Sequence, residues 1–348
     1  MATKKTILIT GATGYIGGSV LSHFLQRPDH GSFEFRALIR SVEKAEKIKA
    51  FGVTPIVGSA SDGELMFKAA SEADIVIALT NCDDLDAAEA ILAGLKKRYE
   101  TTGERPILIH TSGAANLIDN SDGDHPSDFI YDDDNAAQIE SIPLNNPHRH
   151  VDTRIAAAGQ EGYVYTYIVV PSIVYGIAQN LLVDAGISNP SVLFANIFIP
   201  IALQRGDGFR IGEGKNIWGH IEINELVDLY SRVFDAVSND PKNTPNGREG
   251  YYFANSNEHR LIEIYKILAE VFYEQGKGKS PEPTPLTKEE LDRFFGDSPI
   301  VKILFSNSRC VGNRARRLGW KPQKTHKDYL ESFRKDVEGQ IQKSTQSE

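Results

Sequence analysis

A glycine-rich turn near the start of the chain constrains its fold more than any other feature. The apolar run 6–10 leads directly into Gly11-x-x-Gly14-x-x-Gly17, and apolar residues then recur at helical spacing. Between a strand and a helix, Gly11 permits a tight turn, Gly14 lets a diphosphate approach the backbone, and Gly17 lets the helix pack closely on the strand. The helix N-terminus adds free N–H groups and the positive end of its dipole. The turn therefore predicts a dinucleotide-binding site.

Residues 6–111 alternate short β-branched runs with helical patterns, which is typical of a doubly wound parallel sheet. The pattern predicts strands at 6–10, 34–39, 53–57, 74–79, 106–111 and 163–170, and helices at 15–26, 42–51, 62–72, 83–99 and 147–160. The expected fold class is therefore α/β, a Rossmann sheet with helices on both faces.

Composition argues against several classes of partner. The net charge of −9 disfavours a nucleic-acid or anionic-membrane surface. Cys82 and Cys310, the two cysteines, are far apart, so neither a disulfide framework nor a metal-ligand cluster is expected. The first strand begins too early for a cleavable signal, and the longest apolar run, 192–203, is too short to span a bilayer. These features predict a soluble, cytoplasmic protein with no metal site.

Four later stretches carry a family resemblance. They are Ala37-Leu38-Ile39-Arg40-Ser41, Ile107-Leu108-Ile109-His110-Thr111-Ser112-Gly113, Pro171-Ser172-Ile173-Val174-Tyr175-Gly176 and Leu318-Gly319-Trp320-Lys321-Pro322. In this order, and with the Gly-x-x-Gly-x-x-Gly spacing, they resemble the atypical and extended branch of the short-chain dehydrogenase/reductase superfamily. That branch contains the NAD-dependent epimerases and dehydratases and the NmrA-like proteins. The resemblance spans nearly the whole chain and implies a small C-terminal substrate-binding lobe beside the sheet.

The resemblance also implies how the chain is divided. A Rossmann domain is expected over 1–178, with 216–237 and 250–256 returning to it, a substrate lobe over 179–215 and 257–330, and a polar tail over 339–348. The apolar, aromatic segment 192–210 favours a less polar substrate than a nucleotide sugar. Residues 114–146 break the alternation with a long polar stretch that carries seven Asp between 119 and 134. Loops of this length are usually functional lids or disordered insertions, and the acidic spacing does not match a calcium-binding loop.

The residue after the second predicted strand favours one nicotinamide nucleotide over the other. Folds that prefer NAD usually carry an acid there, whereas this chain has Arg40, with Ser41 and Lys44 just beyond. A guanidinium forms bidentate, charge-assisted bonds with a 2′-phosphate, which a carboxylate would repel. NADP(H) is therefore favoured over NAD(H).

The resemblance places further residues on the nucleotide. Asp62 would reach the adenine, and Leu79 and Thr80 would lie against the ribose and phosphates. The expected cofactor-binding residues are Gly11, Thr13, Gly14, Tyr15, Ile16, Gly17, Arg40, Ser41, Lys44, Asp62, Leu79, Thr80, Thr111 and Pro171.

The catalytic residues of the family are only partly present. Its enzymes use a Ser and a Tyr-x-x-x-Lys pair, in which Tyr is the general acid/base and Lys lowers its pKa. Ser112, or Thr111, matches the Ser position, but the Tyr and Lys places are nearest to His148 and Asp152, four apart on one predicted helical face. A His oriented by an Asp is a workable acid/base near neutral pH. Tyr175, after the sixth strand, is the second candidate for proton donor.

Three functions are compatible with this pattern. The first is an NADP(H)-dependent oxidoreductase or epimerase that acts on a small organic substrate. The second is an NmrA-like regulator that binds NAD(P) without turnover and responds to redox state through a protein partner. The third is a redox-neutral isomerase or cyclase on the same fold. A homodimer is compatible with all three.

Overall fold

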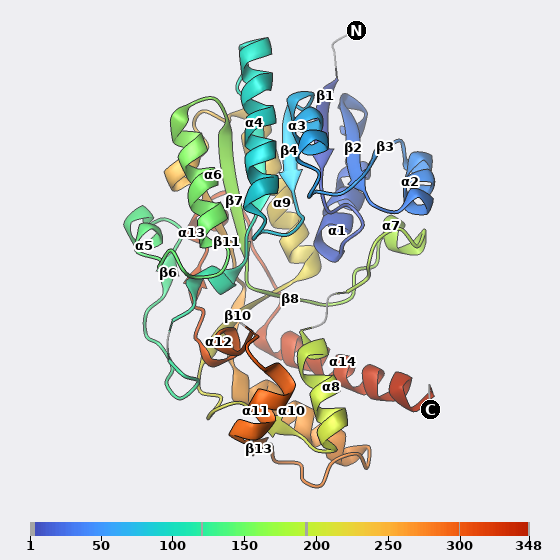
Figure 1. The fold of residues 1–348 in the computed structure, drawn as a ribbon, viewed down its shortest axis with the longest axis vertical. Helices are drawn as coiled ribbons and strands as arrows, with labels where there is room; N and C mark the ends of the chain where they lie inside the picture. The colour runs from blue at the N-terminus through green and yellow to red at the C-terminus, as the bar shows by residue number, and fades with distance from the viewer. Residues whose placement is uncertain (1–3, 120, 192–193, 299, 347–348) are drawn as a thin grey trace.

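The computed structural model of the chain describes residues 4–119, 121–191, 194–298 and 300–346. Its main sheet has seven parallel strands in the order β11-β7-β5-β4-β1-β2-β3 (Figure 1). The strands are β1 (Lys5–Ile9), β2 (Phe33–Ile39), β3 (Thr54–Val57), β4 (Ile75–Ala78), β5 (Ile107–Thr111), β7 (Tyr165–Pro171) and β11 (Tyr251–Ala254). The predicted Rossmann sheet is confirmed.

Helices cover both faces of this sheet. On one face lie α1 (Tyr15–Leu25), α2 (Val42–Ile48) and α9 (Ile223–Asn239), and on the other α3 (Gly63–Ser71), α4 (Leu85–Thr102) and α6 (Arg149–Glu161). Successive strand residues serve opposite faces because side chains alternate along a strand. In β1, Ile7 and Ile9 join the core under α1, whereas Leu8 joins the core under α3 and α4.

The strand order creates a crevice beside β1. From β1 the chain continues outward to β2 and β3, and then returns to the other side of β1 as β4. Ligands of open α/β sheets bind at such a reversal, beyond the carboxyl ends of the strands. The glycine turn follows β1 and Leu79 follows β4, and the Leu79 amide donates to Thr10 Oγ1 at 3.1 Å. The two loops that line the crevice are thus joined directly.

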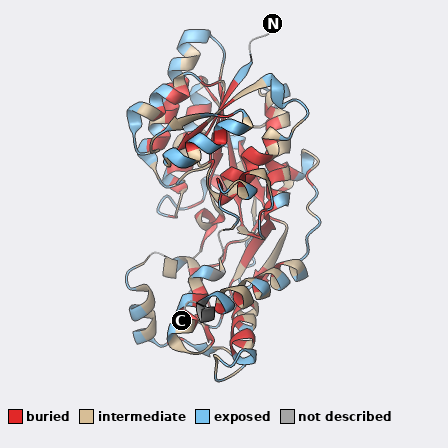
Figure 2. Cartoon of the chain, turned by 90° about the vertical axis from the view of Figure 1, so that its right-hand side faces the viewer, coloured by how far each residue is buried: buried red, intermediate tan, exposed pale blue. Residues whose placement is uncertain are grey.

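A second region lies below the main sheet in Figure 1. It is built on a three-stranded sheet of β8 (Ile173–Tyr175), β10 (Ile217–Glu222) and β12 (Asn257–Arg260). Around it lie α8 (Ala195–Arg205), β9 (Phe209–Arg210), α10 (Leu261–Glu274), β13 (Thr284–Pro285), α11 (Lys288–Phe295), α12 (Ile300–Phe305) and α14 (His326–Gln346). By contrast, α7 (Leu181–Asp184) packs on α1 and α13 (Asn313–Arg317) packs on β11, so both belong with the main sheet. Phe198, Phe209 and Tyr265 belong to its separate core, and Figure 2 shows buried residues in both regions. Of the apolar segment 192–210, residues 192 and 193 lie outside the described residues.

Two polar segments have more structure than their sequences suggest. Residues 114–146, of which 120 lies outside the described residues, contain η3 (Ala114–Leu117), β6 (Tyr131–Asp132) and α5 (Ala136–Glu140). Strand β6 pairs with β14 (Cys310–Val311), and Asn307 donates to the Asp119 carboxylate at 2.9 Å, so the segment is fixed to 305–311. Residues 339–346, expected to be a polar tail, continue α14, with Ile341 buried, and 347–348 lie outside the described residues. No helix within the described ranges has the length and apolar character of a membrane span.

Candidate nucleotide and active site

The glycine turn is closed by its own backbone. The Gly14 amide donates to the Gly11 carbonyl at 2.9 Å, and Gly11 has a φ of +70°, in the left-handed region that favours glycine. A Cβ on Gly17 would lie 2.2 Å from the Gly11 oxygen, and one on Gly11 would lie 2.3 Å from the Leu79 oxygen. Any side chain at either position would therefore push α1 or the β4 loop away from the turn.

A pocket of about 370 Å³ opens beside this turn. Of the residues expected on the nucleotide, Gly11, Thr13, Gly14, Arg40, Leu79 and Thr80 line it. The sequence analysis missed the other lining residues, which are Leu38, Ser59, Ala60, Ser61, Asn81, Asp84 and Asn189. Asn189 comes from the segment before α8, and its amide donates to the Thr13 carbonyl at 3.2 Å. Such a long-range contact has no local sequence signal.

Arg40 lies at the rim of this pocket, and its guanidinium is not paired with a carboxylate of the described residues. Its side chain is exposed, and no hydrogen bond or ion pair engages it within the described part of the chain. Its expected neighbours behave differently, because Ser41 Oγ accepts from the Lys44 amide at 3.3 Å and caps α2. Asp62 likewise accepts from the Leu65 amide at 3.0 Å and caps α3. Neither these two caps nor Lys44 line the pocket.

Four other residues expected on the cofactor direct their side chains elsewhere. Tyr15 is buried and donates to the Gly176 carbonyl at 2.6 Å, and Ile16 packs against the core under α1. Thr111 shares a buried hydrogen bond of 2.6 Å with the Tyr230 hydroxyl. Pro171 ends β7 opposite Ala254. None of these four residues is among those that line the pocket, so their contact with a nucleotide stays a prediction.

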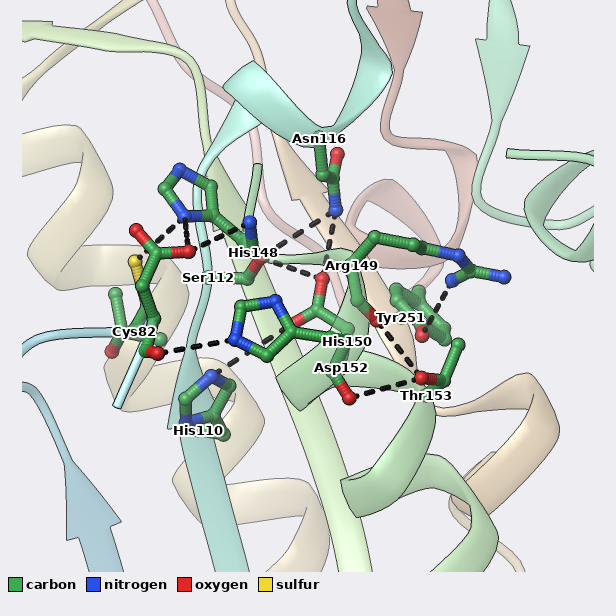
Figure 3. Close-up of polar contacts among 12 residues, drawn as sticks. Cys82, His110, Ser112, Asn116, His148, Arg149, His150, Asp152, Thr153 and Tyr251 are labelled. Carbon is green, nitrogen blue, oxygen red and sulfur yellow. Dashed lines mark hydrogen bonds and ion pairs between the residues drawn. The ribbon is translucent and has the colours of Figure 1, made fainter. Parts of the chain in front are cut away.

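A buried polar group lies just beyond β5 (Figure 3). Ser112 Oγ donates to Asp152 Oδ2 at 2.7 Å, and Asn116 Nδ2 donates to the same oxygen at 2.8 Å. The other oxygen, Asp152 Oδ1, lies 3.7 Å from His110 Nε2, and neither atom has a hydrogen-bond partner among the residues that the structure describes. Asp152 is fully buried and projects from α6 toward the end of β5. The group brings together two expected residues, Ser112 and Asp152, and two that the sequence analysis missed.

Burial controls the protonation of this group. Removal from water raises the pKa of the Asp152 carboxyl to about 6. The hydrogen bonds from Ser112 and Asn116 act in the opposite direction, because they stabilise the ionised form. The same desolvation lowers the pKa of His110 to about 3, so its imidazole is neutral. A carboxylate whose pKa lies near neutrality can take up and release a proton under ordinary conditions, which is the property of a general base.

Replacement of Asp152 by Asn is expected to stabilise the protein above pH 6. The pKa of the carboxyl is higher in the folded protein than its usual 3.8, so ionised Asp152 costs stability above about pH 6, and this cost disappears as the pH falls toward 4. The variant should gain up to about 3 kcal/mol at pH 8 and almost nothing at pH 4. Urea unfolding at both pH values measures the difference. An equal gain at both would contradict a buried, ionisable Asp152.

The structure corrects the predicted pairing of His148 with Asp152. His148 has a φ of +65° and precedes the first residue of α6, so it is not on one helical face with Asp152. Its partner is Asp83, in the loop after β4, which accepts from the His148 backbone amide at 2.8 Å and contacts Nδ1 at 2.9 Å. A Cβ on Gly113 would lie 3.1 Å from His148 Nε2. That nitrogen therefore borders the Ser112 loop, while Asp83 fixes the other.

Cys82 adds a third polar atom to this pair. Its sulfur lies 3.2 Å from His148 Nδ1, and burial raises the pKa of the thiol to about 12. The ligand-type atoms of Cys82, Asp83 and His148 lie within 4.8 Å of one another, a spacing compatible with a metal ion. The expectation of no metal-ligand cluster missed this group because His148 is 65 residues from Asp83 and 66 from Cys82 in the sequence.

Tyr175, the second candidate for proton donor, belongs to a different cluster. Its ring packs edge-on against Tyr329 of α14 at 5.1 Å and against His220 of β10 at 5.8 Å between centroids. Burial raises the pKa of its hydroxyl, which has no hydrogen-bond partner within the described residues. The ring contacts of Tyr175 thus join β8 to β10 and α14 within the second region, and they do not include Ser112 or Asp152.

Known proteins match this arrangement at two levels. Residues 3–97 match the model of the NmrA-like family. Over the whole chain, the oxidase ucsJ of Acremonium sp is 27% identical over 341 residues, covering 92% of this chain and 93% of the relative. The isoflavone reductase homolog P3 of Arabidopsis thaliana is 26% identical and covers 89% of this chain and 88% of its own.

Solved structures share the fold at lower identity. A UDP-glucuronic acid 4-epimerase from Bacillus cereus, in complex with NAD, superposes with a TM-score of 0.61 at 15% identity over 97% of this chain and 99% of its own. A dTDP-glucose 4,6-dehydratase from Bacillus anthracis, also in complex with NAD, has a TM-score of 0.58 at 14% identity and covers 95% of this chain and 96% of its own. The chain is thus similar in fold to these epimerases and dehydratases, and similar in sequence to NmrA-like and isoflavone reductase-like proteins, which agrees with the resemblance that its motifs predicted.

Proposed function

We propose that this protein is a nicotinamide-nucleotide-dependent oxidoreductase or epimerase that acts on a small organic substrate and prefers NADP(H) to NAD(H). The observation that carries the nucleotide preference is the unpaired Arg40 at the rim of the pocket beside the glycine turn. The relatives of this chain include an oxidase and a reductase homolog, which supports redox chemistry. The apolar and aromatic composition of segment 192–210 is the basis for proposing a substrate less polar than a nucleotide sugar.

The pocket residues fit a dinucleotide. Gly14 lines the pocket and has no side chain to occupy the space that a diphosphate needs. The helix α1 begins directly after it, so its N-terminus would face the phosphates. At the pocket rim, the Arg40 guanidinium has hydrogen-bond donors for a 2′-phosphate, and no carboxylate of the described residues, Asp84 of the same pocket included, forms an ion pair with it. A bound nicotinamide ring supplies or accepts the hydride.

Ser112 and Asp152 are the residues proposed to handle the proton. The hydrogen of Ser112 is already directed to Asp152 Oδ2, so a substrate hydroxyl placed against Ser112 would donate to Oγ. On oxidation, the substrate proton moves to Ser112 Oγ as the Ser112 proton moves to Asp152 Oδ2. Reduction reverses both transfers. Asn116 keeps the carboxyl oriented throughout, because it donates to the same oxygen.

His148 is the second group proposed for proton exchange. Its Nδ1 is fixed by Asp83, which leaves Nε2, beside Gly113, as the nitrogen that faces the Ser112 loop. A neutral imidazole held in this way can accept a proton at Nε2. The assignments to Asp152 and to His148 can be told apart by mutation. Replacing the residue that handles the proton should lower turnover far more than replacing the other.

Arg40→Asp tests the nucleotide assignment. Replacing a guanidinium with a carboxylate removes bidentate bonds to the 2′-phosphate and adds repulsion, so NADPH should bind at least about 100-fold more weakly. NADH, which lacks that phosphate, should bind with an affinity within about threefold of that of the wild-type protein. Isothermal titration of both proteins with both nucleotides measures the change.

Arg36→Asp is the matched control for this experiment. Arg36 lies within β2, the strand that Arg40 follows, but its guanidinium is paired with Glu34 and Glu72 and does not line the pocket. This control should leave the NADPH preference intact. An equal loss of NADPH and NADH affinity in Arg40→Asp would sink the 2′-phosphate assignment, and a lack of binding by the wild-type protein would sink the proposed function itself.

A redox-responsive regulator is the second candidate function. It is favoured by the match of residues 3–97 to the NmrA-like family and by His148 and Asp152 at the places of the Tyr-x-x-x-Lys pair. Such a protein would bind NADPH and NADP⁺ with different affinities, show no turnover and bind a protein partner in one nucleotide state only. Detectable turnover with any carbonyl or alcohol substrate would exclude this candidate.

A further inference from the structure

A buried arginine on α6 forms no ion pair with any carboxylate in the described part of the chain. Arg149 is 4% exposed, and its only side-chain hydrogen bond within the described residues is from Nη1 to the Tyr251 hydroxyl at 3.1 Å. Its Nε is buried without a partner. Figure 3 shows the guanidinium directed toward Tyr251 and away from the carboxyl of Asp152, one turn along the same helix. Charged side chains are almost never buried in this way unless they are paired.

The arginine lines a small pocket on the outer side of α6. The pocket has a volume of about 170 Å³ and lies between α5, α6, η4 (Gly247–Glu249) and β11. Its lining residues include Glu140, Arg149, Gln160, Arg248 and Tyr251. None of them lines the pocket beside the glycine turn. The two pockets are therefore separate sites.

The ion pairing around this pocket leaves Arg149 without a carboxylate in direct contact among the described residues, although Glu140 and Asp152 both lie near enough to feel its charge. Arg248 and Glu140 form a two-bond ion pair, with Nε and Nη2 at 2.5 and 2.8 Å from the two carboxylate oxygens. That pair is neutral as a unit, so the wall retains the positive charge of Arg149. The Tyr251 hydroxyl accepts from Arg149, which leaves its hydrogen free to donate, and the exposed Gln160 carries an amide at the pocket wall.

We propose that this pocket binds a small oxoanion, either free phosphate or the carboxylate of a small organic acid. Arg149 supplies the charge, and Tyr251 and Gln160 supply neutral hydrogen-bond donors. A guanidinium with adjacent neutral donors is suited to the planar or tetrahedral oxygens of such anions. The volume accommodates a group of this size but not a nucleotide. The site goes beyond the proposed function and does not depend on it.

Phosphate titration in the presence of saturating NADPH tests the site. The nucleotide occupies the glycine turn, so phosphate binding that remains must occur elsewhere. Isothermal titration of the full chain should then show saturable binding of one phosphate, and a parallel titration with succinate distinguishes a carboxylate ligand from phosphate. Arg149→Gln should weaken binding at least tenfold. If the wild-type chain binds no NADPH, the proposed function fails, and phosphate titration of the chain alone still tests this pocket.

A second variant keeps the test decisive if loss of the buried arginine unfolds the protein. Gln160→Glu places a carboxylate at the exposed edge of the pocket without disturbing the core, and it should also lower affinity at least tenfold. Gln342→Glu, an exposed glutamine on α14, is the matched control and should bind as the wild type does. The proposal is overturned if both glutamate variants bind phosphate equally, or if neither phosphate nor succinate binds the wild-type protein.

Discussion

Asp152→Asn is expected to lower turnover by about 10²- to 10⁴-fold, the usual contribution of a general base. The amide can still accept the hydrogen bonds of Ser112 and Asn116, so the local geometry should persist, but it cannot take up the proton that Ser112 releases. Turnover is followed by nucleotide absorbance with a carbonyl or alcohol substrate identified by screening the wild-type protein. Substrate KM should change far less than kcat.

The pH profile distinguishes this role from a structural one. The pKa of Asp152 is raised to about 6, so wild-type oxidation should fall as the pH drops below 6 and the carboxylate becomes protonated. The residual activity of Asp152→Asn should lack that limb. His148→Ala provides the comparison, since it removes the other proton-exchanging group and leaves the buried carboxyl in place. A variant Asp152→Asn with nearly full turnover, beside an inactive His148→Ala, would transfer the role to His148.

Gly17→Ala is expected to destabilise the protein by about 3 kcal/mol and to weaken nucleotide binding strongly. The added Cβ would lie 2.2 Å from the Gly11 carbonyl oxygen and 2.7 Å from its carbon, and backbone atoms cannot rotate away as a side chain can. The helix α1 must shift away from the turn, so its N-terminus no longer meets the phosphates. Urea unfolding and NADPH titration measure the two effects.

Gly339→Ala is the matched control. Gly339 is also a helical glycine, on α14, and a Cβ there would meet nothing within 4 Å. This change should stabilise the protein by up to about 1 kcal/mol, because alanine has the higher helix propensity. If Gly17→Ala instead behaved like Gly339→Ala, the close approach of helix and turn would not be required.

The sequence predicted the main sheet well because its signals are local. The predicted helix 147–160 matches α6 (Arg149–Glu161), and the predicted strand 34–39 matches β2 (Phe33–Ile39), each within two residues. Alternating apolar residues and caps such as Ser41 define such elements without distant contacts. By contrast, the pairing of β6 with β14 joins residues about 180 positions apart, and two-residue strands have no periodicity.

The candidate site was only partly predictable for the same reason. Family spacing located Ser112 and Asp152, but it did not reveal the bond between them or the role of Asn116. The pairing of His148 with Asp152 was wrong because helical spacing applies only to residues in helical conformation, and His148 has a positive φ. Its actual partner, Asp83, is 65 residues away. Only the three-dimensional arrangement of two loops brings these residues together.

The position of β11 in the main sheet has a consequence for folding. This strand covers β7, yet it follows the whole of α8, β10 and α9 in the chain. During synthesis, the edge of β7 that later pairs with β11 therefore stays unpaired until residue 254 has emerged. Unpaired strand edges readily pair with other chains. A fragment that ends near residue 178 contains the glycine turn but would be prone to aggregate, so chaperone dependence should be greatest while the ribosome is translating the intervening segment.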